Sequence, residues 1–278
     1  MSIDQSYLIV NTDLDATLLD HDTYSWQPAA EAVNLLRNRG IPLVLNSSKT
    51  LSEMKDLAAE LGIQYPLVCE NGSLVAIPQS GELSLSDIEP HVSSIEDEEG
   101  YWICYLGQSR EEVIRIITQL RSDSPECAFM GYGDWTTEEV AEHTGLPIEK
   151  ACLSHQRCGT EPIHWHGSEE AFADFISALE SHNLQAVSGG RFIHLSGKSD
   201  KANGLKKVSA IYQNKLPERD VKTIALGDSP NDLGMLNAAD IAVVIPNKVQ
   251  LSPTAPKVIL AEEHGPKGWN TVMKSLLG

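Results

Sequence analysis

The sequence predicts an α/β protein, in which a doubly wound, Rossmann-like parallel-sheet core is interrupted by an inserted α+β domain. Strand-type and helix-type patterns alternate at both ends of the chain, and this alternation stops in the middle. Alternating strands and helices favour a parallel sheet with helices on both faces. We therefore expect a core of residues 1–83 and 193–278 and an inserted domain of residues 84–192, and a chain of 278 residues can bury such a core.

The N-terminal part of the core follows a strand–helix order. Short apolar runs predict strands, and helical spacing of apolar residues predicts helices. Pro28 is typical of a helix start and Gly62 of a helix end, while Asn71-Gly72 favours a hairpin turn. The expected strands are Tyr7–Asn11, Ile41–Asn46, Leu67–Glu70 and Leu74–Ile77, and the expected helices are Pro28–Arg39 and Leu51–Leu61.

The C-terminal part resumes the same alternation after the inserted domain. The expected helices are Asp200–Tyr212, a short one after Pro230 and a last one near Trp269–Leu277, and the expected strands are Thr223–Leu226 and Ile241–Ile245. Parallel strands at both ends of the chain can therefore join one sheet.

The inserted domain has a different order of elements. Its expected helices are Glu111–Arg121 and Glu169–His182, and its expected strands lie near Tyr101–Leu106, Ile163–His166, Gln185–Ser188 and Arg191–Leu195. The acidic stretch Ile95–Glu99 is expected to be a solvated loop. A domain inserted into an α/β core would act as a lid over the carboxyl edge of the sheet, where ligands bind in such folds.

Composition indicates a globular protein with small-molecule rather than polyanionic partners. The chain is 41% apolar and 22% charged, and its net charge of −18 repels nucleic acid and anionic membranes. It has no apolar run of about 18 residues, and MSIDQSYLIV lacks the pattern of a leader peptide, so we expect a cytoplasmic protein. The 5 cysteines are odd in number and form no Cys-x-x-Cys, which favours reduced thiols. The oligomeric state is not indicated.

The stretch NTDLDATLLD places Asp13 and Asp15 directly after the first expected strand. A polar turn is one interpretation, because Asp is common in turns. A calcium loop is excluded, since Leu18 stands where its sharp turn needs Gly and Tyr24 stands where a bidentate Glu is needed. In extended backbone, residues two apart point the same way, so the third interpretation is a catalytic pair that faces one pocket.

Two more polar loops follow expected strands, at residues 47–50 and 227–232. Carboxyl ends of parallel strands share one edge, so side chains from these loops can converge with the first motif. The residues expected to converge are Asp13, Asp15, Ser47, Asp228 and Asp232. Two carboxylates about 4 Å apart repel by roughly 4 kcal/mol at an effective dielectric of 20. A hard cation such as Mg²⁺ removes this cost and also binds phosphate, and Lys201 can supply a fixed cation against phosphate oxygens.

These motifs resemble those of the haloacid dehalogenase superfamily of phosphatases, in the family's order. The motifs are Asp13-Leu14-Asp15-Ala16-Thr17, Ser47, Lys201 and Gly227-Asp228-Ser229-Pro230-Asn231-Asp232, and the inserted domain resembles a type IIB cap. A closer similarity, to the mannosyl-3-phosphoglycerate phosphatase family, spans nearly the whole chain. It is carried by Ser47–Thr50, Glu70-Asn71-Gly72, Arg157 to Glu161, Gly190-Arg191-Phe192 and Gly265-Pro266-Lys267-Gly268-Trp269.

The resemblance implies a role for each motif residue. It implies that Asp13 is the nucleophile, that Asp15 is the general acid and base, and that Lys201 assists catalysis. The implied phosphate-binding residues are Ser47, Ser48 and Lys201. The implied Mg²⁺ ligands are Asp13, the main-chain carbonyl of Asp15, and Asp228, with Asn231 or Asp232 in the outer part of the site. The implied substrate-binding residues are Lys49, Glu70, Asn71, Arg157, Glu161 and Arg191.

Some of these assignments have rivals within the sequence. Ala16 stands where the family usually has Gly, and its methyl group would crowd the turn if the backbone needs an unusual φ. Lys198 is the alternative to Lys201 as the cation, and ordinary surface ion pairs are the alternative for the arginines and glutamate of the inserted domain. His164-Trp165-His166 could bind a metal, but its pattern is more typical of a half-buried strand.

The function that the resemblance implies is hydrolysis of mannosyl-3-phosphoglycerate or glucosyl-3-phosphoglycerate through an aspartyl-phosphate. The products would be phosphate and the glycosylglycerate, a compatible solute. Another phosphorylated sugar as substrate and a phosphomutase stay open as alternatives. A non-catalytic sugar-phosphate-binding module is disfavoured, because Asp13 and Asp15 are both present.

Overall fold

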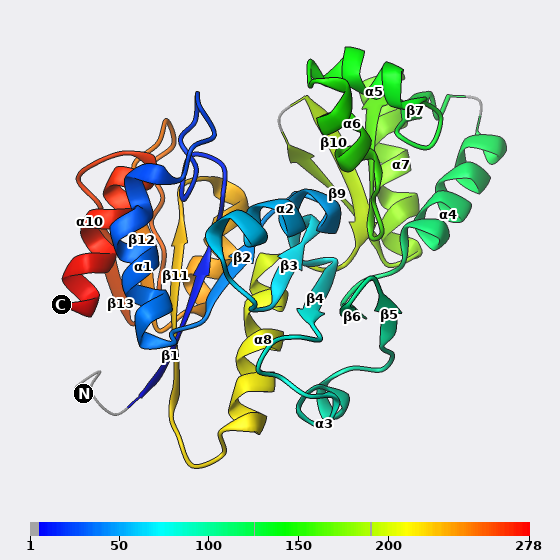
Figure 1. Ribbon diagram of the computed structural model, residues 1–278. Coiled ribbons are helices and arrows are strands. Elements are labelled where there is room, and N and C mark those ends of the chain that lie inside the picture. The colour runs from blue at the N-terminus through cyan, green and yellow to red at the C-terminus, as the bar shows by residue number, and fades with distance from the viewer. Residues whose placement is uncertain (1–5, 125, 190) are drawn as a thin grey trace.

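The computed structural model describes residues 6–124, 126–189 and 191–278. Gly190, which belongs to one of the stretches that carry the resemblance, lies outside these residues. Figure 1 shows a larger body built from the two ends of the sequence and a smaller body built from its middle, drawn in green. This arrangement confirms the predicted fold class, an α/β core with an inserted α+β module.

The larger body is organised around one mixed sheet. Its strands are β1 (Tyr7–Thr12), β2 (Leu43–Asn46), β3 (Leu67–Cys69), β4 (Leu74–Pro78), β5 (Glu96–Glu98), β6 (Tyr101–Tyr105), β11 (Val221–Gly227), β12 (Ile241–Val244) and β13 (Lys257–Leu260). Within the described residues the order is β13-β12-β11-β1-β2-β3-β4-β6-β5. Neighbours from β13 to β3 are parallel, as predicted for β1, β2, β11 and β12, whereas β4, β6 and β5 join by antiparallel pairing.

Helices cover both faces of this sheet. They are η2 (Gln27–Ala29), α1 (Ala30–Arg39), α2 (Leu51–Leu61), η3 (Glu70–Gly72), α3 (Leu85–Ile88), η4 (Glu89–His91), α8 (Lys201–Lys215), η5 (Pro230–Asp232), α9 (Leu233–Ala238) and α10 (Gly265–Leu277). Val10 of β1 packs in one apolar cluster with residues of α1, α2 and α10. Its neighbour Ile9 packs in another cluster with residues of α8. Successive strand residues point to opposite faces, so β1 is buried on both sides and its carboxyl end marks the middle of the sheet edge.

The smaller body is a second sheet with helices. Its elements are α4 (Arg110–Asp123), β7 (Phe129–Gly131), α5 (Thr137–Thr144), α6 (Ile148–His155), β8 (Thr160–Trp165), α7 (Glu169–Ser181), β9 (Leu184–Gly189) and β10 (Phe192–Gly197). The strands are antiparallel in the order β7-β8-β10-β9. Val113 of α4 and Phe175 of α7 pack with Ile163 and Leu195 on one face. Phe192 on the other face packs with residues of α5 and α6.

The structure corrects the expected limits of the insertion. Residues 95–99, expected to be a loop, contain strand β5, and β6, expected in the inserted domain, pairs with β4 in the core sheet. Strand β10 continues in the smaller sheet to Gly197. The chain therefore crosses between the sheets after Tyr105 and after Gly197, rather than near residues 84 and 192. Periodicity identifies a strand, but it does not show which sheet the strand joins. The short elements α3, α5, α6, β7 and β13 were not predicted either.

The two segments in which the chain passes between the sheets contact each other at Gly107 and Gly197. A Cβ atom on Gly197 would lie 2.5 Å from the main-chain nitrogen of Gln108 and 3.0 Å from the Cα atom of Gly107. Such a contact is too short for any side chain. The close approach of the crossings therefore depends on glycine.

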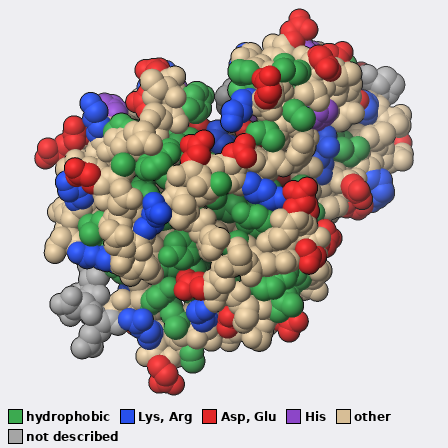
Figure 2. Space-filling view, viewed as in Figure 1, with side chains coloured by type: hydrophobic (Ala, Val, Ile, Leu, Met, Phe, Trp, Pro, Cys, Tyr) green, Lys and Arg blue, Asp and Glu red, His purple; other side chains and the backbone are tan. Residues whose placement is uncertain are grey.

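Side chains of both charges share the visible face of the protein. In Figure 2, acidic and basic side chains are interspersed over both bodies on the face shown. Within the described part of the chain, no helix combines the length and the apolar character that crossing a membrane requires.

Gly72→Ala is expected to lower the free energy of unfolding by about 2–4 kcal/mol. Gly72 has a φ of 87°, and an added Cβ atom would lie 1.9 Å from the main-chain oxygen of Asp200, at the start of α8. Chemical denaturation measures the loss. Gly100→Ala is the control, because Gly100 has a φ of 84° with nothing within 4 Å of the added atom. Equal losses in the two variants would show that backbone strain alone matters.

Candidate active site

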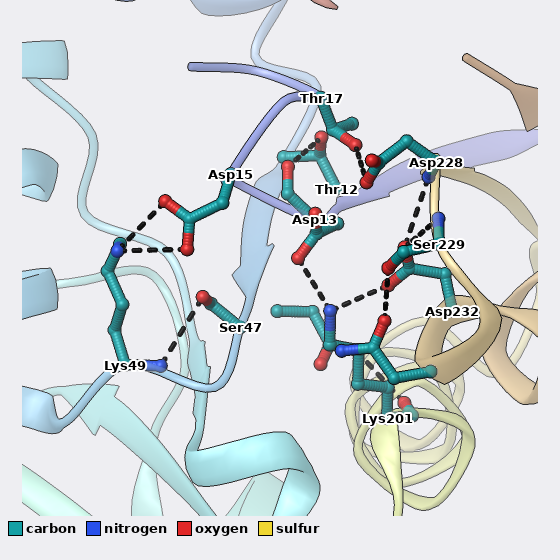
Figure 3. Close-up of polar contacts among 12 residues, drawn as sticks. Thr12, Asp13, Asp15, Thr17, Ser47, Lys49, Lys201, Asp228, Ser229 and Asp232 are labelled. Carbon is teal, nitrogen blue, oxygen red and sulfur yellow. Dashed lines mark hydrogen bonds and ion pairs between the residues drawn. The ribbon is translucent and has the colours of Figure 1, made fainter. Parts of the chain in front are cut away.

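Three carboxylates and one ammonium group meet at the carboxyl ends of β1 and β11. The Nζ atom of Lys201 lies 2.5 Å from Oδ1 of Asp13 and 2.6 Å from Oδ1 of Asp232. Asp228 completes the cluster, and one ligand-type oxygen from each of the three aspartates lies within 4.8 Å of the others. Figure 3 shows Lys201 between Asp13 and Asp232, with Asp228 above them. The structure therefore brings together motifs that lie far apart in the sequence.

The start of α8 positions Lys201. The helix is capped by Asp200, whose carboxylate accepts a hydrogen bond from the N–H of Asn203 at 2.7 Å. Asn46, the last residue of β2, donates its side-chain N–H to the main-chain oxygen of Lys201 at 2.9 Å. Lys201 is 1% exposed, whereas its sequence rival Lys198 is exposed. The geometry places Lys201, and not Lys198, at the cluster.

Burial and neighbouring charges oppose each other in this cluster. Burial alone would lower the pKa of Lys201, but the carboxylates of Asp13 and Asp232 outweigh burial and raise it, so the ammonium stays charged. Burial, together with the charge of Asp232, raises the pKa of Asp13 to about 8, although Lys201 opposes this. Burial and Asp232 also raise the pKa of Asp228. The carboxylates are therefore costly to ionise without a further positive charge.

The loop after β11 holds Asp228 and Asp232 in place. Asp232 Oδ2 accepts hydrogen bonds from the main-chain N–H groups of Asp228 at 3.1 Å and Ser229 at 3.0 Å. Asp228 accepts a hydrogen bond from the Thr17 hydroxyl at 2.9 Å and another from the side-chain amide of Asn247. Sequence reasoning did not identify Asn247, because a lone Asn after β12 carries no motif signal.

The donor set fits a hard divalent cation. Lys201 neutralises one carboxylate charge, and a divalent ion would neutralise the two that are left. Within the described residues, the group of metal-type side chains consists of Asp13, Asp228 and Asp232, so all its donors are oxygens, as Mg²⁺ or Ca²⁺ prefers. Asn231 is exposed, and its amide oxygen accepts a hydrogen bond from Ser229.

Two consecutive buried hydrogen bonds connect helix α10 to the backbone of Asp13. The indole N–H of Trp269 in α10 donates to the Thr12 hydroxyl at 3.0 Å, and this hydroxyl donates to the main-chain oxygen of Asp13 at 2.7 Å. Trp269 is fully buried. The terminal helix thereby fixes the backbone that carries Asp13, a role that sequence reasoning did not assign to Trp269.

Asp15 does not face the same way as Asp13. The backbone leaves the extended conformation after Thr12 and turns, with the N–H of Leu19 bonded to the oxygen of Leu14 at 2.8 Å. The two aspartates therefore do not lie in one extended strand, and that both serve one pocket stays a prediction. Lys49 Nζ lies 2.9 Å from Oδ1 and 3.0 Å from Oδ2 of Asp15, as Figure 3 shows. Burial would lower the pKa of Lys49, but Asp15 and Glu53 outweigh burial and raise it.

Ser47 and Ser48 follow β2, as expected. The Ser47 main-chain N–H donates to the oxygen of Val68 at 3.0 Å, and its side chain is buried, with Oγ accepting the N–H of Lys49 at 3.4 Å. Figure 3 shows Ser47 between the Asp15–Lys49 pair and the Asp13–Lys201 pair. Its position suits contact with a group bound at the cluster.

Glu70 links the core to the inserted domain. Its carboxylate accepts hydrogen bonds from the N–H groups of Cys158 at 2.7 Å and Gly159 at 3.2 Å, and from the Thr160 hydroxyl at 2.6 Å. Arg157 Nη1 lies 3.6 Å from the same carboxylate. The backbone of Glu70 has a φ of 51°. The Glu70 carboxylate is thus bound by other groups of the protein. It binds the inserted domain's loop and is not free for a substrate.

The other expected substrate-binding residues have different surroundings. Arg157 is buried and donates to the Thr160 hydroxyl at 2.7 Å and to the main-chain oxygen of Ser48 at 3.4 Å. Glu161 accepts from Arg110 at 2.8 Å and from the Gly133 N–H at 2.5 Å.

Arg191 and His164, a histidine of β8, have their partners outside the carboxylate cluster. Arg191 is exposed and donates to the main-chain oxygen of Thr144 in α5. His164 stacks on Phe192 with ring centroids 4.5 Å apart, in line with a half-buried strand. Within the described residues, the group able to hold a metal contains no histidine.

A pocket of about 220 Å³, with several polar side chains in its lining, joins Lys201 to the sheet of the smaller body. From the core it is lined by Asn71, whose side-chain oxygen is buried without a hydrogen-bond partner. From the smaller body it is lined by alternate residues of neighbouring strands, including Gln185, His194 and Ser196. Sequence reasoning did not identify these residues, because strand alternation shows two faces but not which one meets the core.

The chain matches known proteins over most of its length. Residues 10–264 match the family model for haloacid dehalogenase-like hydrolases. A protein of Persephonella marina, named glucosyl-3-phosphoglycerate/mannosyl-3-phosphoglycerate phosphatase, is 35% identical over 95% of this chain and 94% of its own. A protein of the same name from Methanococcoides burtonii is 34% identical over 97% of both chains.

A solved structure shows the same fold. It is described as a subclass IIB sugar phosphatase of the HAD superfamily, and its TM-score is 0.61 at 15% identity. The alignment covers 96% of this chain and 98% of that one, so the likeness includes both bodies.

Ala16→Gly is expected to stabilise the protein by about 0.5–1 kcal/mol. Ala16 has a φ of 59°, and this left-handed conformation costs a non-glycine residue roughly 1–2 kcal/mol. Glycine removes that strain, but it also makes the unfolded chain more flexible, which offsets about half of the gain. Thermal unfolding measures the change. Ala59→Gly in α2 is the control and should lose about 1 kcal/mol. A lower melting temperature for Ala16→Gly would contradict the strain argument.

Mg²⁺ should raise the melting temperature more at pH 8 than at pH 5.5. The raised pKa of Asp13 exceeds its unfolded value, so between about pH 4 and pH 8 the metal-free folded protein holds a proton that the unfolded chain lacks. Stability without metal should therefore fall as the pH rises through this window. At pH 5.5 a metal ion must displace that proton, which weakens binding. Thermal unfolding with Mg²⁺ and with a chelator tests this, and an equal Mg²⁺ effect at both pH values would contradict it.

Proposed function

This chain belongs to the haloacid dehalogenase-like hydrolases, and we propose that it is a phosphatase acting on glucosyl-3-phosphoglycerate or mannosyl-3-phosphoglycerate. The observation that carries the chemistry is the position of Asp13, buried at the end of β1 and held at 2.5 Å by Lys201 beside two further carboxylates. The similarity to relatives of that name over nearly the full chain supports the substrate.

The residues present fit Mg²⁺ as the metal. Asp13, Asp228 and Asp232 would hold it, together with the main-chain carbonyl of Asp15, and Asn231 lies at the exposed side of the same loop. When bound, Mg²⁺ would neutralise the carboxylates and withdraw charge from the phosphoryl oxygens. Besides the metal, the phosphoryl oxygens would contact Ser47, Ser48 and Lys201.

The side chains divide the reaction into two steps. A carboxylate oxygen of Asp13 attacks phosphorus and forms an aspartyl-phosphate while the bond from phosphorus to the ester oxygen breaks. Asp15 gives that oxygen a proton. In the second step Asp15 takes a proton from water, the water oxygen attacks phosphorus, the bond to Asp13 breaks and phosphate leaves. Lys201 stabilises the negative charge that develops on the phosphoryl group.

The smaller body would act as the cap over this site. We place it between the two crossings, from about residue 106 to about residue 199, where the sheets change. The amide, imidazole and hydroxyl groups of Gln185, His194 and Ser196 line the pocket next to Lys201 and suit the hydroxyl groups of a sugar. A cytoplasmic location, and the absence of nucleic-acid and membrane partners, stay predictions.

Phosphate-release assays test the substrate, and mass spectrometry tests the covalent intermediate. We expect phosphate release from the two glycosyl esters in Mg²⁺ and none in excess chelator. Asp13→Asn should form no phosphoryl-enzyme, because an amide is a poor nucleophile. Asp15→Asn should be nearly inactive on the glycosyl esters, yet nitrophenyl phosphate should phosphorylate it, because nitrophenolate leaves without a proton. Mass spectrometry of quenched protein should then find the phosphoryl group on Asp13.

Three results would contradict the proposal. Full turnover in chelator would exclude the metal site, and a phosphoryl label on Asp13→Asn would exclude Asp13 as nucleophile. Activity on other sugar phosphates but on neither glycosyl ester would keep the chemistry and move the substrate to the alternative.

A further inference from the structure

Asn247, the third residue after β12, binds the carboxylate of Asp228 through its side chain. The side-chain N–H donates to Oδ2 of Asp228, and the side-chain oxygen accepts the main-chain N–H of Lys248 at 2.7 Å. In an amide group the nitrogen donates hydrogen bonds and the oxygen accepts them. Both ends of the Asn247 side chain therefore have a suitable partner, and its N–H end is the one that faces the carboxylate cluster.

The backbone before Asn247 is held at two successive residues. The Ile245 N–H donates to the main-chain oxygen of Gly227 at 2.9 Å. The main-chain oxygen of Pro246 lies 2.7 Å from Nδ1 of His264, the residue that caps the start of α10. Because Gly227 is the last residue of β11, the side chain of Asn247 has a defined position relative to the loop that follows this strand.

Asp228 is held by neutral donors on both of its oxygens. Oδ1 accepts the Thr17 hydroxyl at 2.9 Å, and Oδ2 accepts the amide of Asn247. Lys201, by contrast, brings a positive charge to its two carboxylate partners. Neutral donors orient a carboxylate without cancelling its charge, and an oxygen that accepts one hydrogen bond keeps a second lone pair. Asp228 is therefore oriented and still able to bind a cation.

Asn247 reaches Asp228 from a side that the inserted domain does not line. A cavity of about 740 Å³ has both residues in its lining, and the rest of the described lining belongs to the loops after β1, β11 and β12 and to the start of α10. Asn247 is exposed, and it does not line the pocket beside Lys201. Its replacement therefore leaves no void in the core and does not alter that pocket.

Hydrogen bonds to a carboxylate that binds a metal increase the affinity for the metal. A mobile carboxylate loses rotational freedom when it binds an ion, whereas a carboxylate that is already held loses less. Loss of one such partner typically lowers metal affinity by about 10- to 100-fold. Thr17 would still hold one oxygen of Asp228, so we expect a loss of about 10-fold for Asn247.

We propose that Asn247 is a positioning residue for the metal site: its amide holds the Asp228 carboxylate in the orientation that binds the divalent cation. The inference rests on the proposed metal-dependent function and adds to it a residue that lies outside the sequence motifs. Asn247 acts through Asp228 and not on the substrate.

Thermal unfolding over a range of Mg²⁺ concentrations tests this without substrate. An ion that binds the folded protein raises its melting temperature according to the ion concentration relative to Kd. Asn247→Leu, of similar size but without an amide, and Asn247→Ala should need about 10-fold more Mg²⁺ than the native protein for the same rise. Asn247→Gln keeps the amide and should need less than either. Excess Mg²⁺ should restore most of the phosphate release that Asn247→Ala loses.

Asn237→Ala is the matched control. Asn237 in α9 is also exposed, and its side-chain oxygen accepts the Thr254 N–H at 2.7 Å. It joins two segments of the larger body, as Asn247 does, but its partner is not a carboxylate of the cluster. This variant should need the same Mg²⁺ concentration as the native protein, whatever its melting temperature in chelator. If Asn247→Ala behaves in the same way, Asn247 only supports its loop and the proposal is wrong.

Phosphate release by the native protein separates this proposal from the function. An unchanged Mg²⁺ requirement in Asn247→Ala, with phosphate release by the native protein, would overturn the role of Asn247 and keep the phosphatase. A raised requirement, without phosphate release from either glycosyl ester by the native protein, would support Asn247 and refute the phosphatase. A native protein whose melting temperature does not respond to Mg²⁺ would overturn the proposal, because Asn247 would have no metal site to serve.

Discussion

The contact on which the site depends is the ammonium of Lys201 buried between Asp13 and Asp232. Two buried carboxylates this close repel each other, and the ammonium offsets that repulsion, while burial alone would lower the pKa of Lys201. Lys201 does not neutralise the whole cluster, and the negative charge that remains at Asp228 suits a metal ion. The same contact therefore stabilises the cluster and prepares it for an anionic substrate.

The fold maintains this contact with elements from distant parts of the chain. Trp269 and Thr12 fix the backbone of Asp13, Asn46 fixes the backbone of Lys201, and Gly72 lets the start of α8 approach the turn after β3. Each support ends on the main chain, at Asp13, Lys201 or Asp200. The acidic and basic side chains are thus positioned by the backbones beneath them, rather than only by attraction to each other.

Asp13 and Asp15 have similar chemistry but opposite environments. Asp13 is buried, with a raised pKa, and faces Lys201, whereas the Asp15 side chain is partly exposed and faces Lys49. Strand β1 ends at Thr12, before both aspartates, so they do not lie in one extended strand. Burial suits a group that attacks phosphorus, and exposure suits one that must move between partners. A straight strand could not produce this difference, because residues two apart would share one side.

The sequence by itself determined the α/β class, the long helices, the parallel strands beside β1 and the motif aspartates, because periodicity and local turn chemistry are short-range properties. Only the tertiary structure decided that β5 and β6 extend the core sheet, that Glu70 binds the inserted domain's loop, and that Asp15 meets Lys49. It also decided that Asn247, Gln185 and His194 border the site. Strand pairing and ion-pair partners join residues far apart in the chain. Which of several possible partners is chosen depends on packing that no local pattern records.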